Sequence, residues 1–144
     1  MRIYLIDNEL IVTKTLQGFL KDLGHDVVPF NSIAEFLNNR IKVNGGNGGI
    51  DVIIVDLNMP KQDGIRLINE IHRKCPHSDI IVMSCILPFH EAITHSVYSY
   101  LKKPIYFDEL ELVLARLSER HNENHNENNE GVSKYMDYVN GKNE

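Results

Sequence analysis

The sequence predicts an α/β fold in which five parallel strands alternate with helices. Short apolar runs, mostly of β-branched residues, recur up to residue 120, and segments with apolar residues at helical spacing separate them. Strict alternation of this kind is typical of a parallel sheet covered by helices on both faces. Polar and charged residues follow four of the runs. They should therefore lie at the edge where open α/β sheets bind their ligands.

The N-terminal part contains the first two strand–helix units. Residues 2–6 form the first strand, and Gly24 is expected to end the following helix in a left-handed conformation. The apolar positions of that helix are Leu10, Ile11, Leu16, Phe19, Leu20 and Leu23. The second strand contains Pro29, which cannot donate to a ladder, so we expect this strand at an edge of the sheet. Ser32 and Glu35 form a capping box that begins the second helix.

The remaining units follow a glycine-rich connection at residues 44–49. This connection precedes a strand, whereas a phosphate-binding loop follows one and ends in Gly-Lys-Ser/Thr, so we interpret it as a linker. The expected elements are a strand at 52–55 buried on both faces, a helix at 63–74, a strand at 79–84, a weak helix from Pro88, a strand at 97–102 and a helix at 106–117.

Composition bounds the domain organisation and the class of partner. The chain has 144 residues, enough for one domain, which we place at residues 1–119; the polar, low-complexity residues 120–144 predict a disordered tail. A net charge of −5 without a basic run argues against nucleic-acid binding within this chain. The sequence contains no membrane-spanning stretch and no signal peptide, so we expect a cytoplasmic location, with Cys75 and Cys85 as buried reduced thiols.

The residues at the strand ends are the candidate site. Asp7 and Asn8 follow the first strand, Asp56 follows the third, Ser84 the fourth and Lys103 the fifth. Because the carboxyl ends of parallel strands share one edge of the sheet, we expect these side chains to converge.

This set of groups favours phosphoryl chemistry. Two carboxylates placed together repel unless a cation joins them, and a hard cation with oxygen ligands is typically Mg²⁺. Asp56 could then act as a nucleophile toward a phosphoryl group, with Lys103 offsetting charge and Ser84 donating a hydrogen bond. Each residue also has an ordinary interpretation, as a turn acid, a solvated strand end or a core hydroxyl. Their convergence from four segments favours the functional interpretation.

The motifs at these positions resemble the receiver domain of two-component response regulators over residues 1–119. They are Leu5-Ile6-Asp7-Asn8-Glu9, Asp56-Leu57-Asn58-Met59-Pro60 with Asp63-Gly64, Ser84 after an apolar strand, and Tyr100-Leu101-Lys102-Lys103-Pro104. The resemblance implies a flavodoxin-like (βα)5 fold with strand order 2-1-3-4-5.

The resemblance also implies roles for the site residues. Asp56 would be the phosphoacceptor of a histidine kinase or a histidine phosphotransfer protein. Lys103 would pair with the phosphoryl oxygens, while Ser84 and Tyr100 would form the switch. The implied ligands of Mg²⁺ are Asp7, Asn8, Asp56 and the backbone carbonyl of Asn58.

Three features depart from the family pattern or refine it. Asn8 stands where the family usually has a second acid, which predicts weaker Mg²⁺ binding. The fourth helix is about one turn short, which predicts a different output partner or dimer mode. Ile86 places an apolar side chain where water would attack, which predicts a long-lived acyl phosphate.

Several functions are compatible with this fold. The favoured one is a signalling switch that is not an enzyme and is read out by protein–protein contacts, with a homodimer through the last two strand–helix units as one expected assembly. The alternatives are a non-phosphorylated pseudo-receiver that binds proteins and the receiver fragment of a longer transcriptional regulator. An aspartyl-nucleophile phosphatase is disfavoured because it needs an acid where Asn58 stands.

Overall fold

The structure, a computed structural model, describes residues 1–39, 49–60, 63–86 and 96–140, with side chains up to residue 125. Five parallel strands form one sheet with the order β2-β1-β3-β4-β5, which confirms the predicted flavodoxin-like topology. The strands are β1 (Arg2–Ile6), β2 (Asp26–Phe30), β3 (Val52–Asp56), β4 (Asp79–Ser84) and β5 (Ser99–Lys102).

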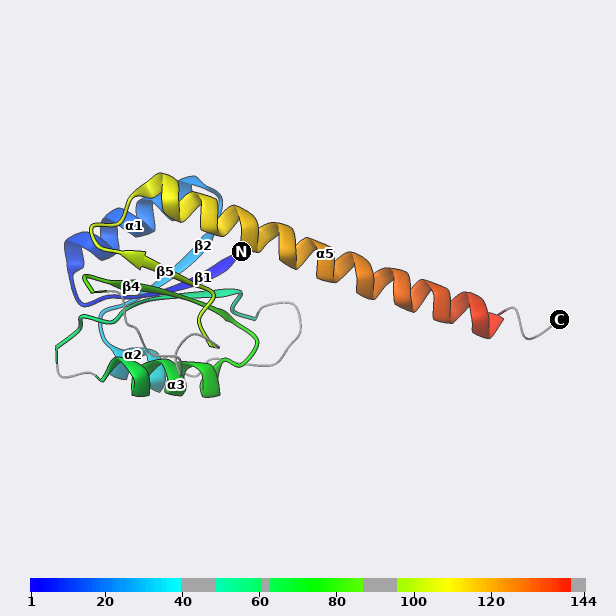
Figure 1. Ribbon diagram of the computed structural model, residues 1–144, viewed down its shortest axis with the longest axis horizontal. Coiled ribbons are helices and arrows are strands. Elements are labelled where there is room, and N and C mark those ends of the chain that lie inside the picture. Colours follow the sequence, from blue (N-terminus) through cyan, green and yellow to red (C-terminus); the bar gives the residue numbers. More distant parts are fainter. Residues whose placement is uncertain (40–48, 61–62, 87–95, 141–144) are drawn as a thin grey trace. The chain divides into compact units, whose positions relative to one another are not determined.

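Helices cover both faces of this sheet, as the alternating pattern predicts. They are α1 (Leu10–Asp22), α2 (Ile33–Asn38) and α3 (Gly64–Lys74). The chain continues after β5 with a further helix, α5 (Phe107–Asn140). Figure 1 shows α2 and α3 side by side on one face and α1 on the other. The weak helix predicted from Pro88 lies outside the described residues. The chain divides into two compact units, Met1–Phe107 and Asp108–Glu144, and the sheet belongs entirely to the first.

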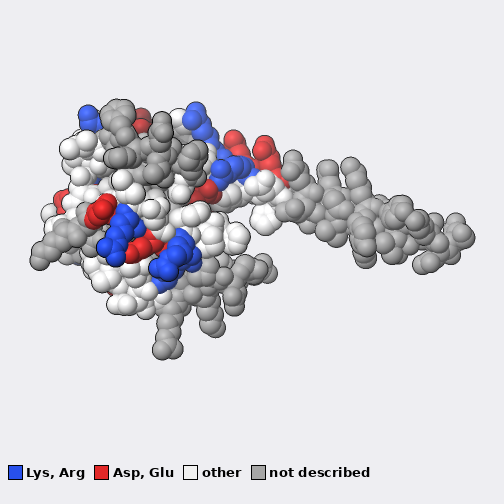
Figure 2. Space-filling model, turned by 60° about the horizontal axis from the view of Figure 1, so that its bottom comes forward, with Lys and Arg blue, Asp and Glu red and all other residues white. Residues whose placement is uncertain are grey.

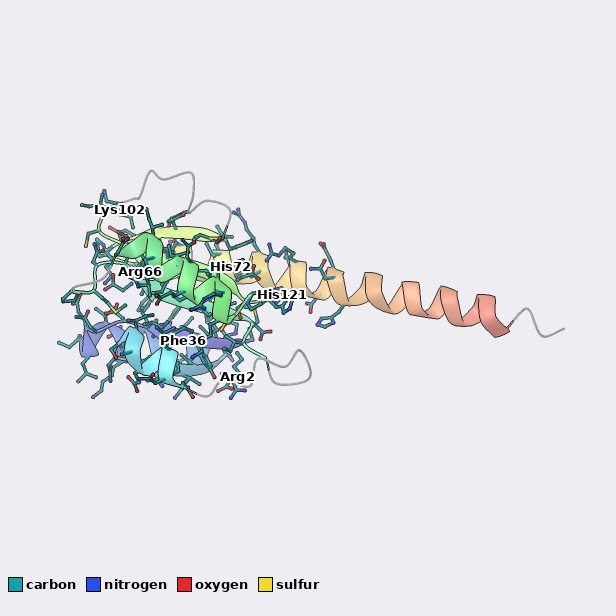
Figure 3. All side chains as sticks on the ribbon, turned by 90° about the horizontal axis from the view of Figure 1, so that it is seen from below. Arg2, Phe36, Arg66, His72, Lys102 and His121 are labelled. Carbon is teal, nitrogen blue, oxygen red and sulfur yellow. The ribbon has the colours of Figure 1, made fainter. Side chains whose placement is uncertain are left out.

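The core is built around β3, the middle strand. All five of its residues are buried, as expected for a strand covered on both faces. On the α2 and α3 side, Phe36 of α2 is fully buried and meets Tyr4 and Phe30 edge-on, with ring centroids 6.3 and 5.6 Å away. Figure 3 labels Phe36 on α2 and Arg66 and His72 on the neighbouring helix α3.

Lys74 at the end of α3 fastens α2 to its neighbour. Its Nζ donates to the carbonyls of Phe36, Leu37 and Asn39, which lie at the C-terminal end of α2. The same ammonium lies 5.3 Å from the centroid of the Phe36 ring. A helix of six residues is thus terminated by a side chain from the next helix.

The outward side of α3 carries charges of both signs. Arg66 and Glu70 form an ion pair at 3.5 Å, one turn apart. Figure 2, which turns the side with α2 and α3 forward, shows basic and acidic side chains next to one another there.

The local turn predictions are confirmed, and the capping prediction is confirmed in part. Gly24 has φ +87°, the left-handed conformation that a helix end requires. Pro29 lies in β2 at the edge of the sheet, opposite Leu5. Half of the predicted capping box forms: the Ser32 hydroxyl accepts from the Glu35 N–H at 3.1 Å and begins α2, but the Glu35 carboxylate accepts from the Asn31 N–H at 2.8 Å.

Three details differ from the prediction. Leu10 and Ile11 are 56% and 83% exposed, because the buried face of α1 carries Thr13, Leu16 and Leu20 at helical spacing. The fifth strand begins at Ser99, two residues later than predicted. Cys75 is buried, but Cys85 is exposed because it follows the end of β4 directly.

The last helix differs from the predicted disordered tail. The structure continues α5 to Asn140, although composition predicts a change at residue 120. Extending an existing helix adds one hydrogen bond per residue without a new nucleation step, which a composition argument does not include. The domain boundary at residue 119 stays a prediction. Within the described residues, no helix combines the length and hydropathy that crossing a membrane requires.

Candidate functional site

Strand register brings two carboxylates together at the carboxyl edge of the sheet. Ile6 of β1 pairs with Val55 of β3, so Asp7 and Asp56, the next residues, are neighbours. Both are buried, with 0% and 1% of their surface exposed. The Asp7 N–H donates to the Phe30 carbonyl of β2 at 3.1 Å, which continues the ladder and fixes the backbone of Asp7 at this edge.

Lys103 supplies a cation to this pair. Its N–H donates to the Ser84 carbonyl at 2.9 Å, which holds its backbone to the end of β4. Its Nζ lies 2.9 Å from Oδ2 of Asp56 and 3.3 Å from Oδ2 of Asp7. Burial alone would lower the pKa of Lys103, but the hydrogen bond and charge of Asp56, together with those of Asp7, raise it above the ordinary value. The ammonium is therefore charged whenever the protein is folded near neutral pH.

The pKa of Asp7 reflects the burial of two carboxylates in one site. Burial raises the pKa of Asp7, and the charge of Asp56 raises it further. The hydrogen bond from the Glu9 N–H, 2.8 Å from Oδ1, and the charge of Lys103 oppose this rise without cancelling it. Burial thus outweighs the contacts that favour the charged form of Asp7.

Glu9 adds a third carboxylate, which the predicted ligand set omits. Ligand oxygens of Asp7, Glu9 and Asp56 lie within 4.8 Å of one another, and Oε1 of Glu9 is 3.7 Å from Nζ of Lys103. Asn8, the residue predicted as a ligand between these acids, is exposed. Its ligand role stays a prediction. The signal for Glu9 was its charge, two residues after Asp7 in the same turn.

The composition of this group fits a hard divalent cation. Three carboxylates face one ammonium, which leaves the site negatively charged. All the donors are oxygens from separate residues, and Mg²⁺ binds through a few such oxygens while keeping several waters.

Asn58 and Ser84 connect the adjoining loops. The Asn58 N–H donates to Oδ1 of Asp56 at 2.8 Å, and its side-chain oxygen accepts from the Cys85 N–H at 2.7 Å. The Ser84 hydroxyl donates to the Ile86 carbonyl at 2.6 Å and accepts from the Ile86 N–H at 3.2 Å. The Ser84 hydroxyl is therefore hydrogen-bonded to the backbone of Ile86, and the Asn58 side chain is hydrogen-bonded to the backbone of Cys85.

Tyr100, the predicted switch residue, lies on β5. Its ring packs partly buried against the core. Its hydroxyl is buried and has no hydrogen-bond partner among the described residues. Burial raises the pKa of Tyr100. Its role as a switch stays a prediction.

An apolar groove of about 350 Å³ adjoins the acidic group. Glu9 and Lys103 line it on the side of the site, and Ile11, Leu16 and Phe107 supply apolar walls. Ile11 and Phe107 are 83% and 40% exposed. A surface that combines exposed apolar side chains with a charged centre is suited to contact with another protein.

The fold and the acidic residues at the carboxyl edge of the sheet agree with the family that the sequence matches. The family model for the response regulator receiver domain matches residues 3–115, and the chain belongs to that family. Receiver domains are signalling modules.

Curated relatives are transcriptional regulators. The transcriptional regulatory protein ZraR of Klebsiella oxytoca is 30% identical over 127 residues, which cover 81% of this chain and 27% of the relative. The transcriptional regulatory protein HptR of Staphylococcus aureus (strain NCTC 8325 / PS 47) is 35% identical over 71 residues, 46% of this chain and 27% of the relative. The chain thus spans about a quarter of the length of the curated relatives it matches.

Solved structures of receiver domains share the fold. A response regulator receiver domain protein from Clostridium thermocellum matches with a TM-score of 0.67 at 27% identity, over 84% of this chain and 96% of that chain. The response regulator TrrA from Thermotoga maritima, in complex with Mg²⁺-BeF, matches with a TM-score of 0.65 at 26% identity, over 81% and 97%.

Proposed function

We propose that this chain is a phosphoacceptor switch in a two-component phosphorelay and that Asp56 receives the phosphoryl group. One observation carries the proposal: Asp56 is buried at the carboxyl edge of β3, 2.9 Å from a charged Lys103. A carboxylate that only capped a turn would not need a buried ammonium from a strand two positions away.

The transfer step follows from this arrangement. A carboxylate oxygen of Asp56 attacks the phosphorus of a phosphohistidine, an O–P bond forms, and the N–P bond breaks as the imidazole leaves with the electron pair. Lys103 lies within reach of the incoming phosphoryl oxygens and offsets their charge. Ser84 then exchanges the Ile86 carbonyl for a phosphoryl oxygen, and Tyr100 moves with the loop.

The oxygens around Asp56 would hold the cation. Asp7, Glu9 and Asp56 form the carboxylate group, and Asn8 and the backbone carbonyl of Asn58 are further predicted ligands. Mg²⁺, when bound, neutralises charge on the phosphoryl group during transfer. The Mg²⁺-BeF complex of TrrA supports this choice of ion.

The partners follow from the surface and from the relatives. The apolar groove beside Glu9 and Lys103 would receive the histidine kinase or phosphotransfer protein, because the donor histidine must reach Asp56 past it. The matching regulators support an output in transcription that is reached through protein–protein contacts in the cytoplasm. A homodimer through the last two strand–helix units stays a prediction.

Phosphorylation with a small donor tests the proposal. The protein is incubated with acetyl phosphate and Mg²⁺, and its intact mass is measured. We expect one added phosphoryl group on the wild type and on Asp22→Asn, an exposed acid in α1, and none on Asp56→Ala. An unmodified wild type would contradict the proposal.

Asn8 favours the second candidate function. A receiver with an amide at this position and without measurable phosphorylation would act as a pseudo-receiver, a module that binds its partner in one conformation. The same mass experiment separates the two functions, because a pseudo-receiver stays unmodified at every Mg²⁺ concentration.

A further inference from the structure

The turn from Asp7 to Glu9 decides whether their two carboxylates meet. The Asp7 N–H is held by the Phe30 carbonyl, and Oδ1 of Asp7 accepts from the Glu9 N–H at 2.8 Å. These contacts fix the start of the turn. The last residue of the turn, Glu9, directly precedes α1, and its carbonyl accepts from the Thr13 N–H at 2.9 Å.

Thr13 fixes the end of this turn from inside α1. Its side chain is buried, with 3% of its surface exposed. Its hydroxyl lies 3.2 Å from the carbonyl oxygen of Asp7 and 3.0 Å from that of Glu9. A single hydroxyl within hydrogen-bond distance of both carbonyls sets the spacing between the first and last residues of the turn.

The hydroxyl extends the backbone bond between Thr13 and Glu9 as far as Asp7, and the side chain of Glu9 takes no part in capping the helix. A residue at this position usually accepts from the first N–H groups of the helix. Glu9 makes no such capping bond within the described residues, and its carboxylate is turned toward Lys103 at 3.7 Å. The backbone of Glu9 is thus held by Thr13, which leaves the carboxylate for the acidic group.

We infer that Thr13 is a positioning residue for the divalent cation of the proposed phosphoacceptor site. It does not touch the ion. It holds the Asp7–Glu9 turn so that both carboxylates lie within 4.8 Å of the carboxylate of Asp56. The inference rests on the proposed function, since it assigns the ion to that site.

The chain offers a matched control in the same helix. Thr15 makes the same kind of bond, from its hydroxyl to the carbonyl of Ile11 at 2.8 Å, but at an exposed position and to a residue outside the acidic turn. Thr13→Val and Thr15→Val therefore remove equivalent side-chain bonds within α1, and only the first touches the turn.

The experiment measures Mg²⁺ binding calorimetrically on metal-free protein. We expect Thr13→Val to weaken the affinity about tenfold, as the loss of a residue that orients metal ligands typically does. Thr13→Ser, which keeps the hydroxyl, should stay within about twofold of the wild type, and so should Thr15→Val. Thr13→Ala serves if the valine variant does not fold. With acetyl phosphate, Thr13→Val should need more Mg²⁺ for half-maximal phosphorylation and reach the wild-type rate at saturation.

Each outcome decides the inference. Wild-type affinity in both Thr13→Val and Thr13→Ala, or an equal loss in Thr15→Val, would overturn it and leave the phosphoacceptor assignment standing. A loss in Thr13→Ser as large as in Thr13→Val would also overturn it, because the hydroxyl would then not be the cause. A wild type that binds no Mg²⁺ would overturn both the inference and the proposed metal site.

Discussion

Replacing Glu9 by glutamine should weaken Mg²⁺ binding about tenfold. The change keeps the size of the side chain and removes one of the three carboxylate charges in the acidic group. Glu9 is the member that sequence reasoning left out of the ligand set, so the variant tests whether the structure has identified the correct acids.

The magnitude follows from the position of the side chain. Glu9 is 62% exposed, so its charge acts through a water-like dielectric. Two unit charges about 4 Å apart interact by about 1 kcal/mol in water, and a divalent ion doubles this to about 2 kcal/mol. Screening at physiological ionic strength reduces the value to about 1.2 kcal/mol, which is close to a tenfold change in Kd.

Urea unfolding with and without Mg²⁺ measures this loss without requiring phosphorylation. An ion that binds only the folded state at about 100 times its Kd adds about 2.7 kcal/mol to the free energy of unfolding. At the same concentration, a variant with tenfold weaker affinity gains about 1.4 kcal/mol. The difference in Mg²⁺-dependent stabilisation between wild type and Glu9→Gln is therefore large enough for urea unfolding to resolve.

The control is Glu70→Gln, which removes a charge from α3 where Glu70 pairs with Arg66. It should bind Mg²⁺ as the wild type does. Equal affinity in Glu9→Gln and the wild type, or an equal loss in both variants, would refute the assignment of Glu9 to the metal site.

Three other predictions concern the same edge of the sheet. Asn8→Asp should lower the Mg²⁺ concentration needed for phosphorylation, and identical titration curves would contradict this. In metal-free protein, the raised pKa of Asp7 means that the folded state binds a proton more tightly than the unfolded state. Stability should therefore fall as the pH rises from the ordinary aspartate range through the raised pKa, and Asp7→Asn should remove that fall in urea unfolding measured across this pH range. Ile86→Glu should lose phosphate faster than the wild type, measured as decay of the phosphorylated mass; equal decay rates would refute a role for Ile86.

Much of the fold could be predicted because its signals are local. Apolar runs and helical spacing define the alternation of elements, and Pro29 alone placed β2 at an edge. Leu10 and Ile11 show the limit of this reasoning: both are apolar residues of α1, but its buried face carries Thr13, Leu16 and Leu20. Spacing identifies a face of a helix, whereas burial depends on where the sheet ends.

The conformation of residues 121–140 shows a second limit. Asparagine, glutamate and histidine dominate the start of this segment, and composition predicts disorder. The structure continues α5 through it. Composition compares the segment with an isolated chain, but the segment follows a helix that is already formed, so the cost of nucleation does not recur.

The sequence could predict only those residues of the candidate site that directly follow a strand. Asp7, Asp56 and Lys103 each follow a strand directly, so parallel register brings them to one edge, and the structure places Lys103 within 3.3 Å of both acids. Glu9 and Thr13 lie beyond the strand, where register gives no information. Their positions depend on how the chain turns into α1.

That turn explains why an amide at position 8 is compatible with the site. Asn8 is exposed, and the turn that Thr13 holds brings Glu9, one residue further along the chain, back to the acidic group. The longer glutamate side chain spans the additional distance and restores the third carboxylate. If this is correct, Glu9→Gln in the Asn8→Asp background should cost less Mg²⁺ affinity than in the wild type, because an aspartate at position 8 would take over part of the charge. Equal losses in the two backgrounds would show that the two positions act independently and that Glu9 does not substitute for the acid at position 8.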